Sequence, residues 1–459
     1  MAAYPRIVIA DERRSGVVPP SVVLVAALKH MGWPLRLFHI GADESAMRLL
    51  KLVTCSDVTL FDPFLLSSTR LLKTLFEVAA SPDCINILVA PLGSRRGDDP
   101  FIVLPAAADV ARTLECPMIP VIYADSSAII AARTLDAALQ GIRSSGPDPC
   151  AGVLYASVLN PREYQLLETE AGRRTPLLHL GYLPQFLERK APSLLELCLP
   201  GAPGSALQIR MAAAQLSGMM DQVEWGAFEA FAKLAPGWTA QPDIGARKAA
   251  GTDVAIFTDE ALGCEGNNAR LLFEYFGCRV TEVPLRSGGF PGGSGAIYIP
   301  HGPAFPCADM ILGNENIRHG LASAIRRRRQ LFVNGGASIL FGETISVLGK
   351  DPLPGVGAGA YAGFLTMPED RIRKVDVLSR RDGIFFEKGA KARGYLPEYL
   401  RVAPRGTVGG AQWSLQDPAR NVELGESGWE TGYTVLNPAY LELWSCPDAT
   451  LRWLTLRKS

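Results

Sequence analysis

The stretch Arg6-Ile-Val-Ile-Ala10-Asp-Glu-Arg-Arg-Ser15-Gly-Val-Val-Pro-Pro20 decides the fold of the first half of the chain. Its β-branched run predicts a buried strand, and an amphipathic segment of helical length follows from Ser21 to His30. A buried strand that turns tightly into a helix is typical of a parallel α/β sheet. Ligands of such sheets bind at the carboxyl ends of the strands, so this turn is the first candidate site.

The same alternation of strand and helix continues to about residue 185 and starts again at Val254–Phe257. Further strands are predicted at Ile85–Ala90, Met118–Tyr123, Gly152–Tyr155, Arg279–Val283, Ala296–Pro300 and Gln330–Val333. Helices are predicted at Ser67–Ala79, Ala106–Leu114, Ser127–Arg143, Asn267–Phe276 and Ile311–Ile325. We therefore expect an α/β domain over residues 1–200, a helical linker over 201–251 and a second α/β domain over 252–459, whose tail from Pro354 onward is less regular.

Composition excludes several classes of function. The 459 residues include 46 Lys plus Arg and 46 Asp plus Glu, so no net charge attracts nucleic acid or anionic lipid. Nine cysteines, an odd number without a CxxC pair, indicate a reducing compartment and no zinc or iron–sulfur site. The sequence shows no signal peptide and no apolar run long enough to span a membrane. We expect a cytoplasmic protein that binds neither nucleic acid nor membranes.

The turn after the first strand has the form of a phosphate-binding loop without its reactive groups. Such loops need a lysine for the phosphates and a Ser or Thr hydroxyl for magnesium. Only Ser15 and Gly16 have suitable residue types, and Val17 and Val18 stand at the lysine and hydroxyl positions. The preceding Asp11 would also repel phosphate. We expect this degenerate loop to bind neither ATP nor magnesium.

A second motif, Gln330-Leu-Phe-Val-Asn-Gly-Gly-Ala337, runs from a strand into a tight turn as a nucleophile elbow does. Gly335 stands where such an elbow presents a thiol or hydroxyl, so no nucleophile is present. No histidine follows His319 to act as a general base. Nothing in the sequence brings Cys264 or Cys307 into this turn.

Several separated stretches, in their order along the whole chain, resemble the cobyrinic acid a,c-diamide synthase family and its sirohydrochlorin-amidating relatives. These stretches are Phe38-His-Ile-Gly-Ala-Asp43, Gly181-Tyr-Leu-Pro184, Asp259-Glu-Ala261 with Asn268, Ile297-Tyr-Ile-Pro300 and Gly432 to Tyr440. The resemblance implies a P-loop NTPase-like domain of the dethiobiotin-synthetase type over residues 1–200 and a class I glutamine amidotransferase-like domain over 252–459. Enzymes of this family use ATP and glutamine-derived ammonia to amidate tetrapyrrole carboxylates.

The resemblance also assigns the missing groups. The family's nucleophilic cysteine falls on Gly335, and its two histidines fall on Glu442 and Trp444. Its magnesium-binding Glu-Gly pair falls on Ala90-Pro91, and its base-reading asparagine falls on Ala156. By this comparison the chain is a degenerate member without catalytic residues.

Four residues remain as candidates for ligand binding, each with a plainer alternative. Asp43 is a candidate cation or polar ligand, or caps a turn. Arg95 and Arg96 lie at the correct end of the sheet to meet tetrapyrrole carboxylates, or are solvated. His301 replaces a glycine of the family's turn and is the histidine nearest the former active face, as a ligand-binding or a turn residue.

Two hypotheses follow. The first is a catalytically inactive paralogue that binds a tetrapyrrole, or acts as a scaffold or regulator, as a homo-oligomer or with an intact homologue or another protein. The second is an ATP-dependent amidotransferase or ligase of cobalamin or sirohydrochlorin-type biosynthesis with altered catalytic residues. The first is favoured because both halves of the chain lack their reactive groups together, and no cofactor is expected apart from a tetrapyrrole as candidate ligand.

Overall fold

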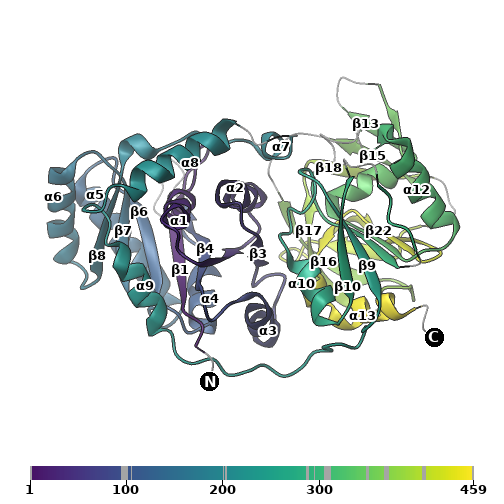
Figure 1. Cartoon of the computed structure of the whole chain (residues 1–459), viewed down its shortest axis with the longest axis horizontal. Helices are drawn as coiled ribbons and strands as arrows, with labels where there is room; N and C mark the ends of the chain where they lie inside the picture. The colour runs from purple at the N-terminus through teal and green to yellow at the C-terminus, as the bar shows by residue number, and fades with distance from the viewer. Residues whose placement is uncertain are drawn as a thin grey trace. The chain divides into compact units, whose positions relative to one another are not determined.

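The structure is a computed structural model that describes residues 3–94, 102–104, 106–199, 201, 204–285, 289–293, 295–303, 312–347, 351–365, 372–405 and 410–456. The chain forms two compact units (Figure 1). The first comprises Met1–Pro63, Ser68–Pro192 and Ala202–Gln241, and the second comprises Phe64–Ser67, Ser193–Gly201 and Pro242–Ser459. The linker predicted over residues 201–251 is divided between the units: residues 202–241 belong to the first, and residues 201 and 242–251 belong to the second.

The first unit is built on a parallel sheet of strand order β3-β2-β4-β1-β6-β7-β8. These strands are β1 (Arg6–Arg13), β2 (Leu35–Ile40), β3 (Val58–Phe61), β4 (Ile85–Ser94), β6 (Met118–Tyr123), β7 (Gly152–Val158) and β8 (Leu178–Pro184). The short β5 (Ile102–Val103) pairs antiparallel with β4. The sequence pattern correctly predicts β1, β4, β6 and β7, whose apolar runs are buried.

Helices cover both faces of this sheet. They are α1 (Pro20–His30), α2 (Glu44–Thr54), α3 (Thr69–Ala79), α4 (Ala106–Thr113), α5 (Ala128–Ser144), α6 (Pro161–Gly172), α8 (Gly204–Ser217) and α9 (Trp225–Leu234). The crossovers through α1 and α2 run from β1 towards the β3 edge of the sheet, and those through α4 and α5 run the opposite way, from β4 to β6 and from β6 to β7. Right-handed crossovers therefore place these two pairs on opposite faces. Helix α8 packs against α1 and α2, which explains why this part of the predicted linker belongs to the first unit (Figure 1).

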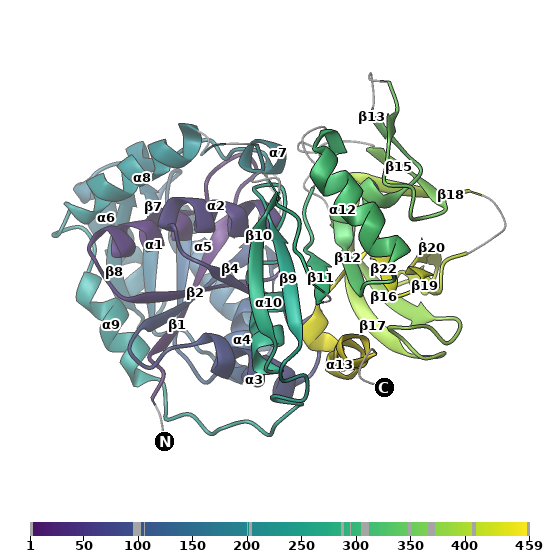
Figure 2. The same cartoon turned by 45° about the vertical axis from the view of Figure 1, so that its right-hand side comes forward.

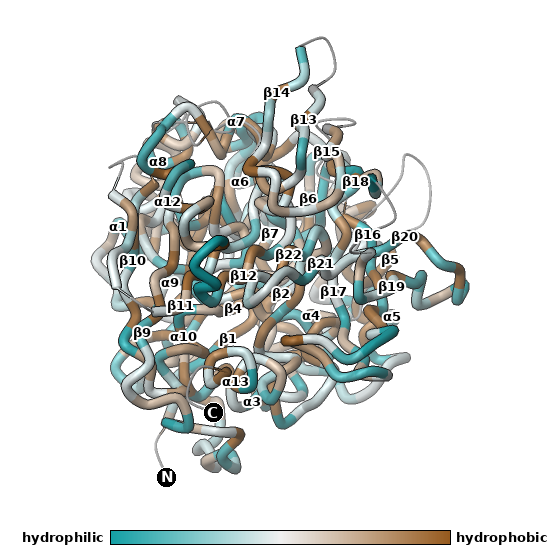
Figure 3. The backbone as a smooth tube through the Cα atoms, turned by 90° about the vertical axis from the view of Figure 1, so that its right-hand side faces the viewer, coloured by the Kyte–Doolittle hydropathy of each residue, from teal (hydrophilic) through white to brown (hydrophobic). Residues whose placement is uncertain are grey.

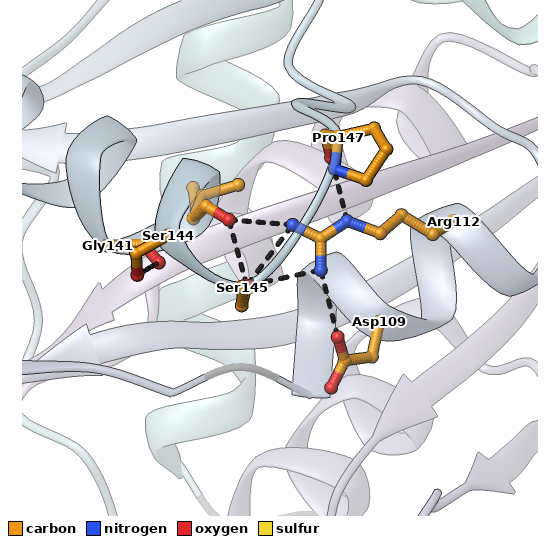
Figure 4. A network of polar contacts seen from close by, with 7 residues as sticks. Asp109, Arg112, Gly141, Ser144, Ser145 and Pro147 are labelled. Carbon is orange, nitrogen blue, oxygen red and sulfur yellow. Dashed lines mark hydrogen bonds and ion pairs between the residues drawn. The ribbon is translucent and has the colours of Figure 1, made fainter.

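Arg112 joins the end of α4 to the end of α5 (Figure 4). Its Nε donates to the carbonyl of Pro147 (2.7 Å), and its Nη2 donates to the carbonyl of Ile142 (2.7 Å). Its Nη1 pairs with Asp109 (3.0 Å), and both terminal nitrogens lie 3.2 Å from the hydroxyl of Ser145. One guanidinium thus bonds a carbonyl in the last turn of α5 and a carbonyl in the segment that follows it, and so fixes the C-terminal end of this helix.

The second unit contains a six-stranded sheet of order β10-β9-β11-β12-β22-β21, parallel except for β21. Its strands are β9 (Asp253–Thr258), β10 (Arg279–Pro284), β11 (Ala296–Ile299), β12 (Leu331–Asn334), β21 (Trp429–Thr431) and β22 (Thr434–Asn437). Helices α10 (Asn268–Tyr275) and α12 (Glu315–Arg326) lie between the predicted strands. The predicted fold class, two α/β units built on parallel sheets, is confirmed.

Between β12 and β22, and with one strand that follows β22, the chain builds two smaller sheets where the sequence pattern shows only an irregular tail (Figure 2). One has the order β14-β13-β15-β18, formed by β13 (Thr344–Val347), β14 (Leu353–Pro354), β15 (Tyr361–Leu365) and β18 (Leu400–Pro404). The other has the order β20-β19-β16-β17-β23, formed by β16 (Ile372–Ser379), β17 (Lys391–Pro397), β19 (Trp413–Gln416), β20 (Glu423–Ser427) and β23 (Tyr440–Leu441).

Hydropathy varies from residue to residue along the chain (Figure 3). Within the described ranges, no helix combines the length and the apolar character needed to cross a bilayer.

Candidate functional site

The loop after β1 uses its backbone donors within the protein. The N–H of Val17 donates to the carbonyl of Arg14 (3.4 Å), and the N–H of Val18 donates to the carbonyl of Arg189 (2.9 Å). Pro19 and Pro20 have no N–H to offer. A phosphate-binding loop depends on converging free N–H groups, whereas the N–H groups of Val17 and Val18 already bond to backbone carbonyls of the chain.

A carboxylate of the chain caps the helix at the position where a phosphate would bind. Asp11, 0% exposed, accepts hydrogen bonds through Oδ2 from the backbone N–H of Ser21 (3.0 Å) and from the Ser21 hydroxyl. Ser21 lies in the first turn of α1, where the positive end of the helix dipole favours an anion. Burial raises the pKa of Asp11, and the nearby Arg13 opposes that rise. Asp11 therefore satisfies the helix terminus that a triphosphate would otherwise contact.

Arg13 links this carboxylate to the start of α2. Its Nε lies 2.9 Å from Oδ1 of Asp11, and its Nη1 lies 3.3 Å from Oδ2 of Asp43. Asp43 is the N-cap of α2, and its Oδ1 accepts the N–H of Ala46 (2.9 Å). Burial opposes ionisation of Asp43, but the charges of Arg13 and His39 outweigh it and lower its pKa. The alternative interpretation of Asp43 as a cap is confirmed, and its ligand-binding role stays a prediction.

Arg14 is held in a similar way on the other side of the loop. Its Nη2 donates to Oδ1 of Asp125 (3.0 Å), and its guanidinium lies 3.7 Å from the ring centroid of Tyr123. Its Nε lies 3.7 Å from the buried carboxylate of Glu12. The two arginines that follow β1 are therefore committed to carboxylates of the chain itself.

The elbow after β12 has the backbone of a nucleophile turn. Gly335 has a φ of +58°, a conformation that costs little for glycine and strains other residues. A Cβ on residue 335 would lie 2.0 Å from Nδ1 and 2.7 Å from Cγ of His301. Ordinary contacts between such atoms are about 3.5–4.0 Å, so the imidazole fills the space of a side chain at this position.

His301 also takes the backbone donor of the elbow. The N–H of Gly336 donates to Nδ1 of His301 (3.0 Å), which assigns the ring proton to Nε2. In nucleophile elbows, the N–H of the residue after the nucleophile contributes to the oxyanion hole. One buried side chain, 1% exposed, therefore fills the nucleophile position and accepts the hydrogen bond of the N–H that would bind an oxyanion.

Contacts on every side fix the position of His301. Its backbone N–H donates to Oε2 of Glu265 (2.7 Å), and its carbonyl accepts the N–H groups of Gly263 (2.8 Å) and Cys264 (2.9 Å). Its ring stacks on Tyr440, with centroids 5.1 Å apart and planes inclined by 26°. The predicted turn position is thus a rigid part of the core.

Glu265 anchors a buried polar network beneath the elbow. Its Oε1 accepts the hydroxyl of Tyr298 (2.7 Å), whose oxygen accepts Nδ2 of Asn334 (2.9 Å). Asn334 also bonds both backbone groups of Leu441, through Nδ2 to the carbonyl (2.8 Å) and through Oδ1 from the N–H (3.0 Å). Burial raises the pKa of Glu265 to about 7, although the donors from His301 and Tyr298 favour its ionised form. These residues hold the elbow rather than expose it.

Glu442 and Trp444, which stand where the resemblance leads us to expect histidines, are buried and hydrogen-bonded. Glu442 is 2% exposed, and its Oε2 accepts Nδ2 of Asn268 (2.8 Å) and the hydroxyl of Tyr440 (2.7 Å). Trp444 is fully buried, and its Nε1 donates to the carbonyl of Asn268 (2.9 Å). Neither residue supplies a base at the elbow, and both tie the end of the chain to α10.

The structure brings together some of the predicted site residues. His301 meets Gly335, whereas Arg95, Arg96 and Cys307 lie outside the described residues. The sequence does not reveal the ion pairs of Arg13 and Arg14 or the hydrogen-bond network of Glu265. Contacts between distant segments leave no local pattern. The basic pair that follows the first strand is the signal that was available.

Metal-binding groups are not assembled in the described part of the chain. Within it, no cluster of three or more His, Cys, Asp or Glu side chains is placed to hold an ion. The eight cysteines described there are free thiols. Burial raises the pKa of Cys446 to about 12, so its thiol is not a ready nucleophile.

Comparison with known proteins gives one relative of similar length. No protein-family model matches the chain. The chain is 23% identical over 462 residues to the cobyrinate a,c-diamide synthase of Syntrophotalea carbinolica, with 97% of each chain covered.

Several similar solved structures each cover about half of the chain. They include PurLQS from Thermotoga maritima (14% identity, TM-score 0.33, 45% of this chain and 98% of that chain) and a glutamine amidotransferase (14%, 0.34, 45% and 99%). FlhF complexed with GTP and Mg²⁺ matches with 13% identity, a TM-score of 0.27, and coverage of 46% and 74%. These TM-scores are too low to support the fold class, which is therefore assigned from the strand orders of the two parallel sheets. Along nearly its whole length, the chain is similar to a cobyrinate a,c-diamide synthase.

Proposed function

We propose that the chain is a catalytically inactive relative of cobyrinate a,c-diamide synthase that binds a tetrapyrrole or acts as a scaffold or regulator in the cytoplasm. One observation carries this proposal: the His301 imidazole fills the space that a nucleophile on residue 335 would need. Glutamine hydrolysis by this type of elbow requires that nucleophile and a free oxyanion donor. The similarity to a cobyrinate a,c-diamide synthase supports a connection with tetrapyrrole chemistry.

The first unit supports the same proposal independently. Asp11 caps α1 with a carboxylate, and the Val18 N–H bonds to Arg189 instead of a ligand. A triphosphate would have to displace this carboxylate, and the loop has no lysine to bind the phosphates. An amidotransferase or ligase would need ATP-dependent activation or glutamine hydrolysis, and the chain lacks the usual reactive groups of both reactions.

Calorimetry of the purified chain tests the proposal with three kinds of ligand. We expect no heat of binding with ATP and magnesium or with glutamine, and saturable binding of at least one metallated or metal-free tetrapyrrole acid. Micromolar binding of ATP would contradict the proposal for the first unit.

If all three ligands fail to bind, the scaffold form of the proposal requires a protein partner. A second copy of the chain or an intact homologue would then increase the mass in solution. Light scattering after size-exclusion chromatography measures that mass for the chain alone and for its mixture with an intact homologue. A chain that stays monomeric in both and binds no tetrapyrrole would contradict the proposal altogether.

A further inference from the structure

A groove of about 600 Å³ opens within the second unit, and no residue of either degenerate motif lines it. Its walls come from β16, β17, β18, β19 and β20, which Figure 2 labels in the second unit. Pockets of about 300–1,000 Å³ are typical of small-molecule sites. The volume therefore fits a small organic ligand better than a folded partner.

The inner wall of the groove is apolar. Leu400 (4% exposed) and Leu415 (1% exposed) belong to the core of the unit and also line the groove. A register shift in the pairing of β19 with β20 falls beside Gly425, and a Cβ on Gly425 would meet no atom within 4 Å. The bulge and the glycine together leave open space above an apolar surface, as ligand sites require.

Of the charged side chains at the rim, all except one arginine form ion pairs with described residues. Arg373 donates to Glu398 through Nη2 (2.9 Å), and Glu426 is bonded by Arg380 (2.8 Å). Arg401 also lines the groove, is exposed, and makes no ion pair with any described residue. One guanidinium without an ion pair among the described residues thus lines the groove together with its leucine wall, and a guanidinium is the side chain best suited to a carboxylate or sulfonate.

We propose that this groove binds an organic acid with an apolar body, held by Arg401 through its acidic group and by the leucine wall through its body. The proposal goes beyond the proposed function, because the groove uses neither the degenerate loop nor the elbow. Carboxylated tetrapyrroles belong to this chemical class, and so do simpler aromatic acids.

Fluorescence titration of the full chain with 8-anilinonaphthalene-1-sulfonate and, separately, with coproporphyrin tests the proposal. We expect saturable binding of at least one probe, weakened about tenfold by Arg401→Ala because a charge-assisted contact is lost. Binding should also weaken as the salt concentration rises, since the rim is exposed. Arg405→Ala, at an exposed arginine just beyond β18 that does not line the groove, is the matched control and should leave the affinity unchanged.

A second variant tests the space rather than the charge. Leu424→Trp, on the half-buried edge strand β20, should fill the groove and weaken binding at least tenfold. Cooperative thermal unfolding of each variant shows that the probe reports the groove and not an unfolded state. Absence of saturable binding, or wild-type affinity in both Arg401→Ala and Leu424→Trp, would overturn the proposal. These outcomes are independent of whether the chain binds ATP or hydrolyses glutamine.

Discussion

The imidazole of His301 fills the space in which a side chain on Gly335 would lie. Nδ1 of His301 lies 2.0 Å from the position of a Cβ on residue 335. The same nitrogen accepts the N–H of Gly336. The glycine at the elbow and the histidine in the facing turn are therefore a matched pair, and neither is explained without the other.

Substitution of Gly335 by alanine should destabilise the protein strongly, and the effect should depend on His301. Overlap with the ring adds to the strain of a positive φ, so we expect a loss of about 3–5 kcal/mol in the free energy of unfolding. In the His301→Ala background the ring is absent, and the same substitution should cost only about 1–2 kcal/mol. Chemical denaturation of the four proteins in this double-mutant cycle measures the coupling.

Gly432→Ala provides the matched control for this cycle. Gly432 has nearly the same φ, +61°, but a Cβ there would meet no atom closer than 3.4 Å. Gly432→Ala should therefore lower the free energy of unfolding by about 1–2 kcal/mol whether or not His301 is present. Additive effects of Gly335→Ala and His301→Ala would show that the two positions do not share a space.

Restoring the lysine and hydroxyl of the phosphate loop should not restore nucleotide binding. In a Val17→Lys/Val18→Thr variant, Asp11 still holds the Ser21 N–H and its charge still opposes phosphate. We expect the Kd for ATP with magnesium to stay above about 1 mM, because the backbone donors remain occupied. Calorimetric titration measures this constant, and micromolar affinity would show that the loop lacks only its two side chains.

The buried Glu265 should make stability fall as the pH rises. Its pKa of about 7 in the folded protein exceeds the value near 4.3 of an unfolded glutamate. Between about pH 4.3 and 7 the folded state keeps a proton that the unfolded state has lost, so folding weakens by at most about 1.4 kcal/mol per pH unit. Above pH 7 both states are ionised and this contribution becomes constant.

Glu265→Gln isolates that contribution, because glutamine resembles the protonated carboxyl. The difference in unfolding free energy, wild type minus variant, should decrease from pH 5 to pH 7 in urea titrations. His39, whose pKa burial lowers to about 4, acts in the opposite direction, and it cancels because both proteins contain it. Glu398→Gln, at the exposed rim of the groove, is the control, and an equal slope in both variants would exclude Glu265 as the cause.

Arg112 should contribute more to stability than its half-exposed surroundings suggest. Arg112→Ala removes bonds to two carbonyls and to Asp109, so we expect a loss of about 1–3 kcal/mol (Figure 4). Arg143→Ala, which removes one exposed pair with Asp148, should cost less than about 1 kcal/mol. Thermal unfolding compares them, and equal losses would mean that the carbonyl bonds contribute nothing.

The parallel sheets were predictable because their strands are buried on both faces. Runs such as Ile7 to Ala10 and Leu331 to Val333 are continuously apolar, and such runs identify strands without knowledge of their neighbours. Strand β20, Glu-Leu-Gly-Glu-Ser, has no such run and forms because β19 supplies a partner. Strands of this kind are determined by tertiary contacts, and the groove that they build was therefore not predictable.

The missing reactive groups were readable from the motifs, but the groups that replace them were not. Val17 and Gly335 can be recognised by position alone. The filling of the elbow by His301 depends on a contact between two separate turns, and the Asp11 cap depends on a hydrogen bond from the first turn of α1 back to β1. Sequence position brought His301 near the elbow, and only the structure gives its contact with Gly335.

Release of ammonia from glutamine tests the central claim most directly. The purified chain is incubated with ¹⁵N-amide glutamine, with and without ATP and magnesium, beside an active glutamine amidotransferase as positive control, and ¹⁵N-ammonia is measured by NMR. A filled elbow predicts no ammonia above the protein-free background under either condition. Steady ammonia release that co-purifies with the chain and changes with substitution of His301 would contradict it.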